Sequence, residues 1–212
     1  MQFVKKADGS FEELPKKNID FGGGLERITM ATVASDIFLI DVFDRAREVL
    51  EVRSGKKYGN QEAVTRSMRI VLDHIRAASF MLAEGVVPSN TEAGYVLRRL
   101  IRRSIRETDR LGIKDAALPE IAEGFGVVYK DYYPHVTENA GKIREGLSSE
   151  ESRFRKALSQ GMRELEKMGA EVDAFMLFTT YGFPIELTEE IAKERGIRVD
   201  LDVVRRQMAE HQ

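Results

Sequence analysis

Apolar residues recur at helical spacing over almost the whole chain after Leu25, and this periodicity limits the fold more than any other feature. Glycine and proline interrupt the pattern at residues 54–59, 85–90 and 111–115. The expected helices cover 26–34, a stretch that starts at Asp36 or Asp41 and ends at Leu50, 61–83, 91–111, 148–168, a short segment near 173, 186–195 and 201–210. The sequence therefore predicts a mainly α-helical protein.

Residues 1–20 follow a different pattern. The stretches MQFVK and FEELP flank a turn-like ADGS and are followed by KKNIDF, which predicts a hairpin and one more short strand. An isolated hairpin is only marginally stable in water. We therefore expect this segment to pack on the helices or to belong to a larger sheet that the chain does not contain.

Composition excludes several classes of protein. The 212 residues include no cysteine and three widely separated histidines, so disulfides and thiolate or histidine metal sites are not expected. No run approaches the roughly 18 apolar residues of a membrane span, and the first residues lack the apolar stretch of a secretory signal. We expect a cytoplasmic protein with no membrane partner and no metal site.

Residues 98–106, RRLIRRSIR, concentrate positive charge although the formal net charge is only -2. At 100° per residue, the five arginines span an arc of about 140°, opposite an apolar face that includes Leu97, Ile101 and Ile105. Such a cationic face suits the phosphates of a nucleic-acid backbone. The alternative is a solvated face balanced by acids from neighbouring helices, and the acids Glu92, Glu107 and Asp109 also lie nearby in the sequence.

The sequence Pro88-Ser89-Asn90-Thr91 directly precedes the arginine-rich stretch. Ser89 or Asn90 could simply cap the following helix, because both residue types are common helix caps. An Asn amide can also donate to and accept from base edges, which phosphate-binding arginines do not do. Asn90 is therefore a candidate for reading a nucleic-acid base.

Three consecutive glycines, Gly22 to Gly24, lie between a predicted strand and a predicted helix, and Arg27 follows one turn later. Backbone without side chains can approach a flat or phosphorylated ligand closely, and the arginine can reach a phosphate oxygen. The spacing matches neither a P-loop nor a dinucleotide fingerprint. A tight structural turn without a ligand remains the alternative at this point.

Several motifs together resemble the alanyl-tRNA synthetases, a family of class II aminoacyl-tRNA synthetases. The stretch NIDFGGGLER at 18–27 is similar to the third class II signature motif. The stretches DHIRA at 73–77, PSN at 88–90, GYVLRRLIRR at 94–103 and TYGFP at 180–184 follow the family's order and approximate spacing. The resemblance covers almost the whole chain.

This resemblance implies a helical tRNA-binding domain preceded by a short β remnant of the class II antiparallel catalytic sheet. Residues 1–36 would be the end of the catalytic domain, and residues 37–212 the helical domain that recognises the tRNA acceptor stem. Arg27 would hold the ATP phosphates, Gly24 would lie under the adenine, Asp20 would hold the amino group of alanine, and Gly22 would line the alanine pocket. Asp20 and Arg27 would be the catalytic residues of the set.

The resemblance also implies which residues contact tRNA. The counterpart of Asn90 reads the wobble G·U pair of the acceptor stem from the minor-groove side. The phosphates would be held by Arg98, Arg99, Arg102, Arg103 and Arg106. The family pairs the asparagine with an aspartate, but Thr179 occupies that position here, which puts wobble-pair discrimination in doubt. Phe21 and Gly23 also depart from the usual Thr and Met.

The first and second class II motifs and the downstream editing domain are absent from the sequence. The full enzyme would use ATP with Mg²⁺, alanine and tRNA(Ala), whereas we expect no cofactor bound to this piece and no alanine activation by it alone. A second hypothesis is a helical protein-interaction domain with a structural glycine turn. A third is a naturally split synthetase whose catalytic segment is a separate chain.

Overall fold

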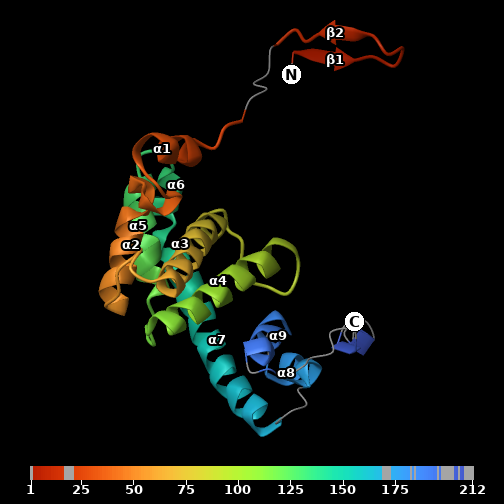
Figure 1. The fold of residues 1–212 in the computed structure, drawn as a ribbon. Helices are drawn as coiled ribbons and strands as arrows, with labels where there is room; N and C mark the ends of the chain where they lie inside the picture. The colour runs from red at the N-terminus through yellow and green to blue at the C-terminus, as the bar shows by residue number, and fades with distance from the viewer. Residues whose placement is uncertain are drawn as a thin grey trace. The chain divides into compact units, whose positions relative to one another are not determined.

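The structure is a computed structural model that describes residues 2–16, 22–168, 173–181, 183, 185–194, 196, 203–204 and 206–207. It is mainly helical, with one small two-stranded antiparallel sheet, and it divides into two compact units, Met1–Asp44 and Arg45–Gln212 (Figure 1). Within the described residues, every helix is too short or too polar to span a membrane. The domain boundary that we place after residue 36 stays a prediction.

The predicted hairpin is confirmed. Strand β1 (Phe3–Lys5) pairs antiparallel with β2 (Phe11–Glu13), and Val4 lies opposite Glu12. Gly9 has φ 85°, a conformation that glycine adopts without steric cost, and this closes the turn. The further short strand expected after the hairpin falls mostly on residues 17–21, outside the described residues.

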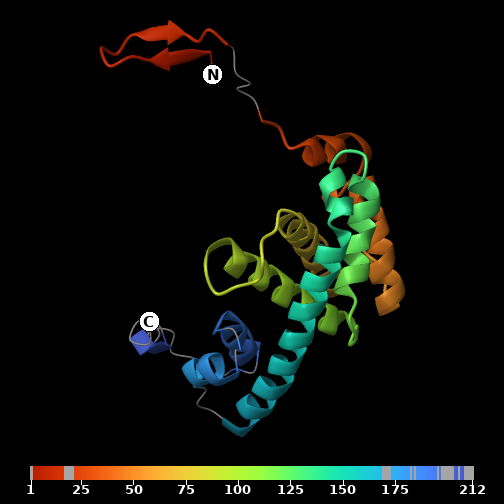
Figure 2. The same ribbon diagram turned by 180° about the vertical axis from the view of Figure 1, so that it is seen from behind.

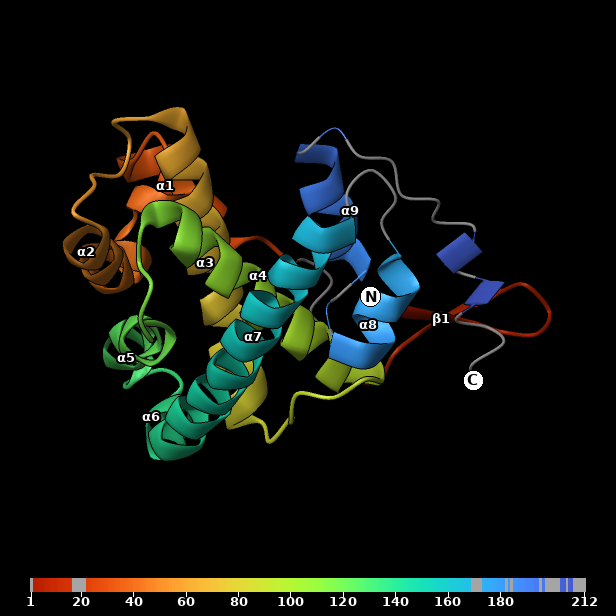
Figure 3. The same cartoon turned by 90° about the horizontal axis from the view of Figure 1, so that it is seen from below.

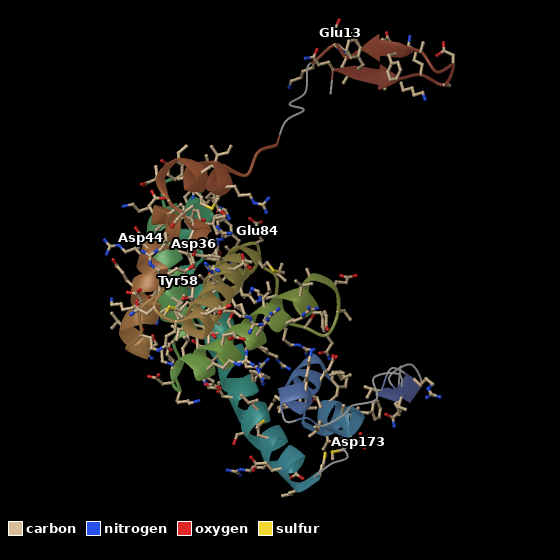
Figure 4. The ribbon with its side chains drawn as sticks, viewed as in Figure 1. Glu13, Asp36, Asp44, Tyr58, Glu84 and Asp173 are labelled. Carbon is tan, nitrogen blue, oxygen red and sulfur yellow. The ribbon has the colours of Figure 1, made fainter. Side chains whose placement is uncertain are left out.

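In its other described residues, the first unit contains helix α1 (Leu25–Val33), the short 3-10 helix η1 (Ile37–Leu39) and the start of the next helix up to Asp44. The Asp36 carboxylate, labelled in Figure 4, accepts a hydrogen bond from the backbone N–H of Phe38 at 3.1 Å. Asp36 therefore caps η1, and the following helix α2 (Asp41–Ser54) begins separately at Asp41.

In its described residues, the second unit contains helices and the loops that connect them, and no strand. After the end of α2 come α3 (Glu62–Ala83), α4 (Glu92–Leu111), α5 (Leu118–Tyr129), α6 (Pro134–Glu138), α7 (Ala140–Met168), α8 (Ala174–Tyr181) and α9 (Ile185–Glu194). The expected helices at 61–83 and 91–111 agree with α3 and α4. Most of the expected helix at 201–210 lies outside the described residues.

Three helical segments were not predicted from the sequence: α5, α6, and α7 before residue 148. Helix α5 and this part of α7 contain glycine, which is unfavourable inside helices. Packing explains two of these glycines. A Cβ on Gly124 would lie 2.8 Å from the backbone N of Ala46, and a Cβ on Gly146 would lie 2.5 Å from Leu82 Cδ2. Backbone contact leaves no room for a Cβ at Gly124, whereas at Gly146 the Leu82 side chain would have to shift, and the local signal is misleading for that reason.

Helix α7 is the central element of the second unit and contacts α3, α4, α5, α6 and α8 (Figures 2 and 3). Leu97, Ile101 and Ile105 of α4 are fully buried, as the helical period predicts. The core around them is made by Met68, Leu72, Ile75, Phe125, Leu147 and Phe154. Helix α4 is thus held between neighbours on more than one side, which decides which of its arginines reach the solvent.

Candidate nucleic-acid interface

The loop before α4 is clamped onto the first turn of that helix. The backbone N–H of Ser89 donates to the carbonyl of Gly94 at 3.1 Å, and the Ser89 hydroxyl donates to the carbonyl of Thr91 at 3.0 Å. A Cβ on Gly94 would lie 2.2 Å from Ser89 Oγ and 2.5 Å from the carbonyl oxygen of Val87. Only glycine lets the loop approach so closely, and the loop then presents Asn90 in an exposed position.

The backbone at the start of α4 is strained. Glu92, the first residue of the helix, has φ 48°, the one positive φ among the described non-glycine residues. A left-handed conformation costs an L-residue roughly 1–2 kcal/mol. Such strain persists where surrounding contacts fix the backbone, and here the Ser89 and Gly94 contacts lie on either side of Glu92.

Asn90 and Arg98 form a side-chain pair. Arg98 Nη1 donates a hydrogen bond to Asn90 Oδ1, although the two residues are eight positions apart. Because a guanidinium group only donates, the amide oxygen of Asn90 faces Arg98. The Asn90 Nδ2 group then remains to donate to an acceptor outside the chain.

The five arginines of residues 98–106 do not share one solvent-exposed face, so that expectation is wrong for Arg102 and Arg106. Arg102 Nε donates to Glu150 Oε1 at 2.6 Å, and its guanidinium carbon lies 5.1 Å from the centroid of the Phe154 ring. The Arg102 side chain is only 15% exposed, and Arg106 is buried at 9%. Arg102 points inward because its partners Glu150 and Phe154 lie on α7, which packs against α4, and Arg106 is buried one turn further along α4.

Arg99 and Arg103 do reach the solvent. Among the residues that the structure describes, neither side chain forms an ion pair or a hydrogen bond. Arg98 is partly exposed beside Asn90. The outward stripe of α4 therefore consists of Arg99 and Arg103, with the Asn90–Arg98 pair nearer its N-terminal end.

Two of the acids that lie near this stripe in the sequence, Glu107 and Asp109, are engaged elsewhere. Glu107 is 2% exposed and accepts hydrogen bonds from Ser67 Oγ and Arg110 Nη1, each at 2.7 Å. Asp109 Oδ1 accepts from Arg155 Nη1 at 2.7 Å. The alternative of a face balanced by these acids therefore fails for Glu107 and Asp109.

A network of charges joins α4, α5 and α7 beneath the surface. Glu151 of α7 is 1% exposed, and its Oε1 accepts from Arg155 Nη2 at 2.9 Å. Burial raises the pKa of Glu151, although hydrogen bonds from Arg155 and from the backbone N–H groups of Ala117 and Leu118 oppose this. Burial also tends to lower the pKa of Arg155, but hydrogen bonds to Asp109 and Glu151 outweigh it and raise that pKa.

The predicted nucleotide-binding residues lie in the first unit. Gly24 precedes α1 with φ -75°, and Gly22 also needs no positive φ; within the described residues, a Cβ on Gly22 would meet nothing within 4 Å. Arg27 is exposed. Asp20 lies outside the described residues. The sterics of the described chain therefore do not by themselves require glycine at Gly22 or Gly24.

Thr179 is exposed on α8, and its hydroxyl donates to the carbonyl of Phe175 at 2.9 Å. Asp173, labelled in Figure 4, caps this helix by accepting from the N–H of Met176 at 2.8 Å. The buried Phe183 packs so closely on α7 that a Cβ on Gly161 would lie 2.4 Å from its ring. The hydroxyl keeps its lone pairs for an outside donor, and no described contact joins it to Asn90 or Arg98.

The sequence analysis did not identify Gly94 as a residue that positions Asn90, nor the inward partners of Arg102. A glycine in the first turn of a helix, four residues after Asn90, is a signal that could have identified Gly94. Nothing local could have identified Glu150, which is 48 residues away from Arg102 in sequence.

The whole chain, residues 1–212, matches the family model of the class II (A) tRNA synthetases. The chain belongs to this family. It is 40% identical over 215 residues to an alanine-tRNA ligase of Halalkalibacterium halodurans, covering 95% of this chain and 24% of the relative. It is 42% identical over 223 residues to that of Borreliella afzelii, covering 100% of this chain and 38% of the relative.

An alanine-tRNA ligase of Thermotoga maritima is 41% identical over 219 residues, which cover 100% of this chain and 25% of the relative. The chain therefore spans about a quarter to two fifths of the length of these relatives. The similarity over the full chain supports the resemblance seen in the individual motifs.

Proposed function

We propose that the chain is part of an alanine-tRNA ligase, which adenylates alanine with ATP and transfers it to tRNA(Ala), and that this part chiefly binds the acceptor stem. Membership of the synthetase family and the names of the relatives support the reaction. The observation that carries the RNA-binding role is the pair of exposed arginines Arg99 and Arg103, whose side chains form no ion pair within the described residues, beside the exposed Asn90 that Arg98 holds.

In this proposal, some of these residues contact the RNA phosphates and others contact a base. Arg99 and Arg103 contact phosphates, which gives affinity without sequence preference. The Nδ2 group of Asn90 donates to a base edge in the shallow minor groove of the RNA stem, while Arg98 holds the amide in orientation. The Thr179 hydroxyl is the proposed acceptor for a base amino group. Arg102 and Arg106, by contrast, hold α4 in place.

For the nucleotide, we propose that exposed Arg27 contacts the ATP phosphates and that adenine lies against the backbone at Gly24. An exposed cation one turn after bare, extended backbone fits an anionic ligand with a flat base. Asp20 would hold the amino group of alanine and Gly22 would line its pocket. ATP supplies the activated phosphate, and Arg27 neutralises charge that develops there. We assign no residue of this chain to the Mg²⁺ that accompanies ATP.

Binding of an acceptor-stem RNA hairpin at two ionic strengths tests the RNA-binding role. The variant Arg99→Gln/Arg103→Gln should lower the slope of log affinity against log salt by about 1.4 to 1.8, since each phosphate contact contributes about 0.7 to 0.9. The matched control, Lys130→Gln/Lys142→Gln, changes the net charge equally at exposed positions outside α4. Equal slopes for wild type and the α4 variant would overturn the role of the stripe.

Helix α1 favours a protein partner as a second candidate function. Leu25, Ile28 and Val33 are exposed at 76%, 54% and 73%. A covering partner, such as a separate chain that carries the rest of a catalytic domain, would remove this apolar surface from water. Mixing the chain with the catalytic segment of a relative and measuring ATP-pyrophosphate exchange tests this, and the absence of exchange above that of the segment alone would refute it.

A further inference from the structure

A second part of the chain has the charge pattern of α4. Residues 93–106 and 152–163 are the two longest stretches that contain basic residues but no acid, with five arginines in the first and four basic residues in the second. The second stretch lies on α7, directly after Glu150 and Glu151, and both of these acids are buried. On each helix, therefore, the stretch borders a buried acid, Glu107 on α4 and Glu151 on α7, and some of its basic residues remain exposed.

Arg153, Lys156 and Arg163 of α7 are exposed. In the part of the chain that the structure describes, none of them forms an ion pair or a hydrogen bond through its side chain. At 100° per residue they lie within about 80° of one another, and at 1.5 Å per residue the row is about 15 Å long. The basic residue between them, Arg155, instead turns inward to Asp109 and Glu151.

This row is fixed relative to the outward stripe of α4. Arg102 connects the two helices through Glu150 and Phe154, both of which are on α7 and close in sequence to Arg153. Arg102 also lies next to Arg103 in the sequence of α4. A buried ion pair in good geometry fixes the position of both elements that contribute to it. The two groups of cations are thus held on one rigid support.

We propose that Arg153, Lys156 and Arg163 form a second phosphate-binding row that contacts the backbone of the same bound RNA; the proposal rests on the RNA-binding role proposed for α4. The exposed residues between them, Ser159 and Gln160, are polar, as is the exposed Ser152 just before Arg153. Protein interfaces are centred on buried apolar or aromatic residues, which this row lacks. A straight row of cations without an apolar centre favours a regular polyanion over an acidic protein segment.

The test compares the full chain with Arg153→Gln/Lys156→Gln/Arg163→Gln and with a control, Arg45→Gln/Lys130→Gln/Lys142→Gln, which has the same change in charge at exposed positions. Binding of an acceptor-stem hairpin is measured by fluorescence anisotropy at two salt concentrations. The α7 variant should bind at least tenfold more weakly at low salt, with a salt slope lower by about 2 to 3. The control should stay within about twofold of wild type, and circular dichroism should show equal helix content in all three.

The outcomes separate this inference from the proposed function. If the α7 variant binds as wild type while Arg99→Gln/Arg103→Gln is impaired, the second row is wrong and the role of α4 stands. If neither variant changes binding, both proposals fail. If the α7 variant loses binding to a polyglutamate peptide but keeps its RNA affinity and salt slope, the row serves an acidic protein and the proposal is overturned.

Discussion

The two flanks of α4 carry the same residue type and differ in almost every physical respect. On the outward flank, Arg99 and Arg103 are exposed and have no described side-chain partner. On the inward flank, Arg102 is paired with Glu150, whose side chain is 4% exposed, and the Arg102 guanidinium lies over the ring of Phe154. The difference teaches that the count of arginines overstates the positive charge that α4 exposes to solvent, because part of that charge is paired or buried inside the unit.

The largest expected effect is on the inward flank. Arg102→Ala would leave Glu150 buried without this partner, and breaking a buried pair in this way costs about 3–5 kcal/mol. Arg103→Ala, one residue away but exposed, should change the free energy of unfolding by less than about 0.5 kcal/mol. Urea unfolding of both variants measures the contrast.

The double variant Arg102→Met/Glu150→Leu sharpens this comparison. Replacing both members of a buried pair by apolar residues is often neutral or stabilising. The double variant should therefore recover much of the stability that Arg102→Ala loses. If Arg102→Ala proves as stable as Arg103→Ala, the arginines of the two flanks contribute equally to the free energy of unfolding, which contradicts the proposed difference between them.

An intermediate effect is expected where the loop meets the outward flank. Gly94→Ala would force Val87 and Ser89 away from α4, at a cost of about 1–3 kcal/mol, and should weaken RNA binding by displacing Asn90. Gly126→Ala is the matched control, because a Cβ there meets nothing within 4 Å; it should stabilise α5 by about 0.5–1 kcal/mol.

Thermal unfolding and hairpin binding of both glycine variants check this prediction. A Gly94→Ala protein with wild-type stability and affinity would show that the loop adjusts without consequence for Asn90. A Gly126→Ala protein that loses as much stability as Gly94→Ala would show that the space around a glycine does not determine how much stability its replacement by alanine costs.

The smallest effect concerns the dependence of stability on pH, and it arises from the inward network. Burial raises the pKa of Glu151 above 4.5, its ordinary value, so the folded state holds this proton more tightly than the unfolded state. The stability contributed by this protonation is fully present below pH 4.5 and is lost as the pH rises through the raised pKa. Glu151→Gln removes the titration.

Urea unfolding of wild type and Glu151→Gln over pH 4 to 8 measures this effect. Wild type should lose stability relative to the variant as the pH rises, and the difference should level off once Glu151 is ionised in the folded state. A difference that is independent of pH, or one that grows in favour of wild type, would contradict the effect of burial on this carboxyl group.

The sequence predicted much of this fold and only part of the candidate site. The hairpin and helices α3 and α4 follow from turn residues and helical period, both of which are local properties. The period also placed Leu97, Ile101 and Ile105 in the core. It could not place Arg102 and Arg106, because a helical wheel divides one core side from one solvent side, whereas α4 contacts both α3 and α7.

Family membership and the identity of Asn90 as a candidate were already present in the order of motifs along the chain. The tertiary structure decided which arginines reach the solvent, why Gly94 is glycine, and that Glu107, Glu150 and Glu151 face inward. The physical reason is that helix formation and amphipathicity depend on residues a few positions apart. Burial of a charge depends instead on a partner such as Glu150, which only folding brings to Arg102.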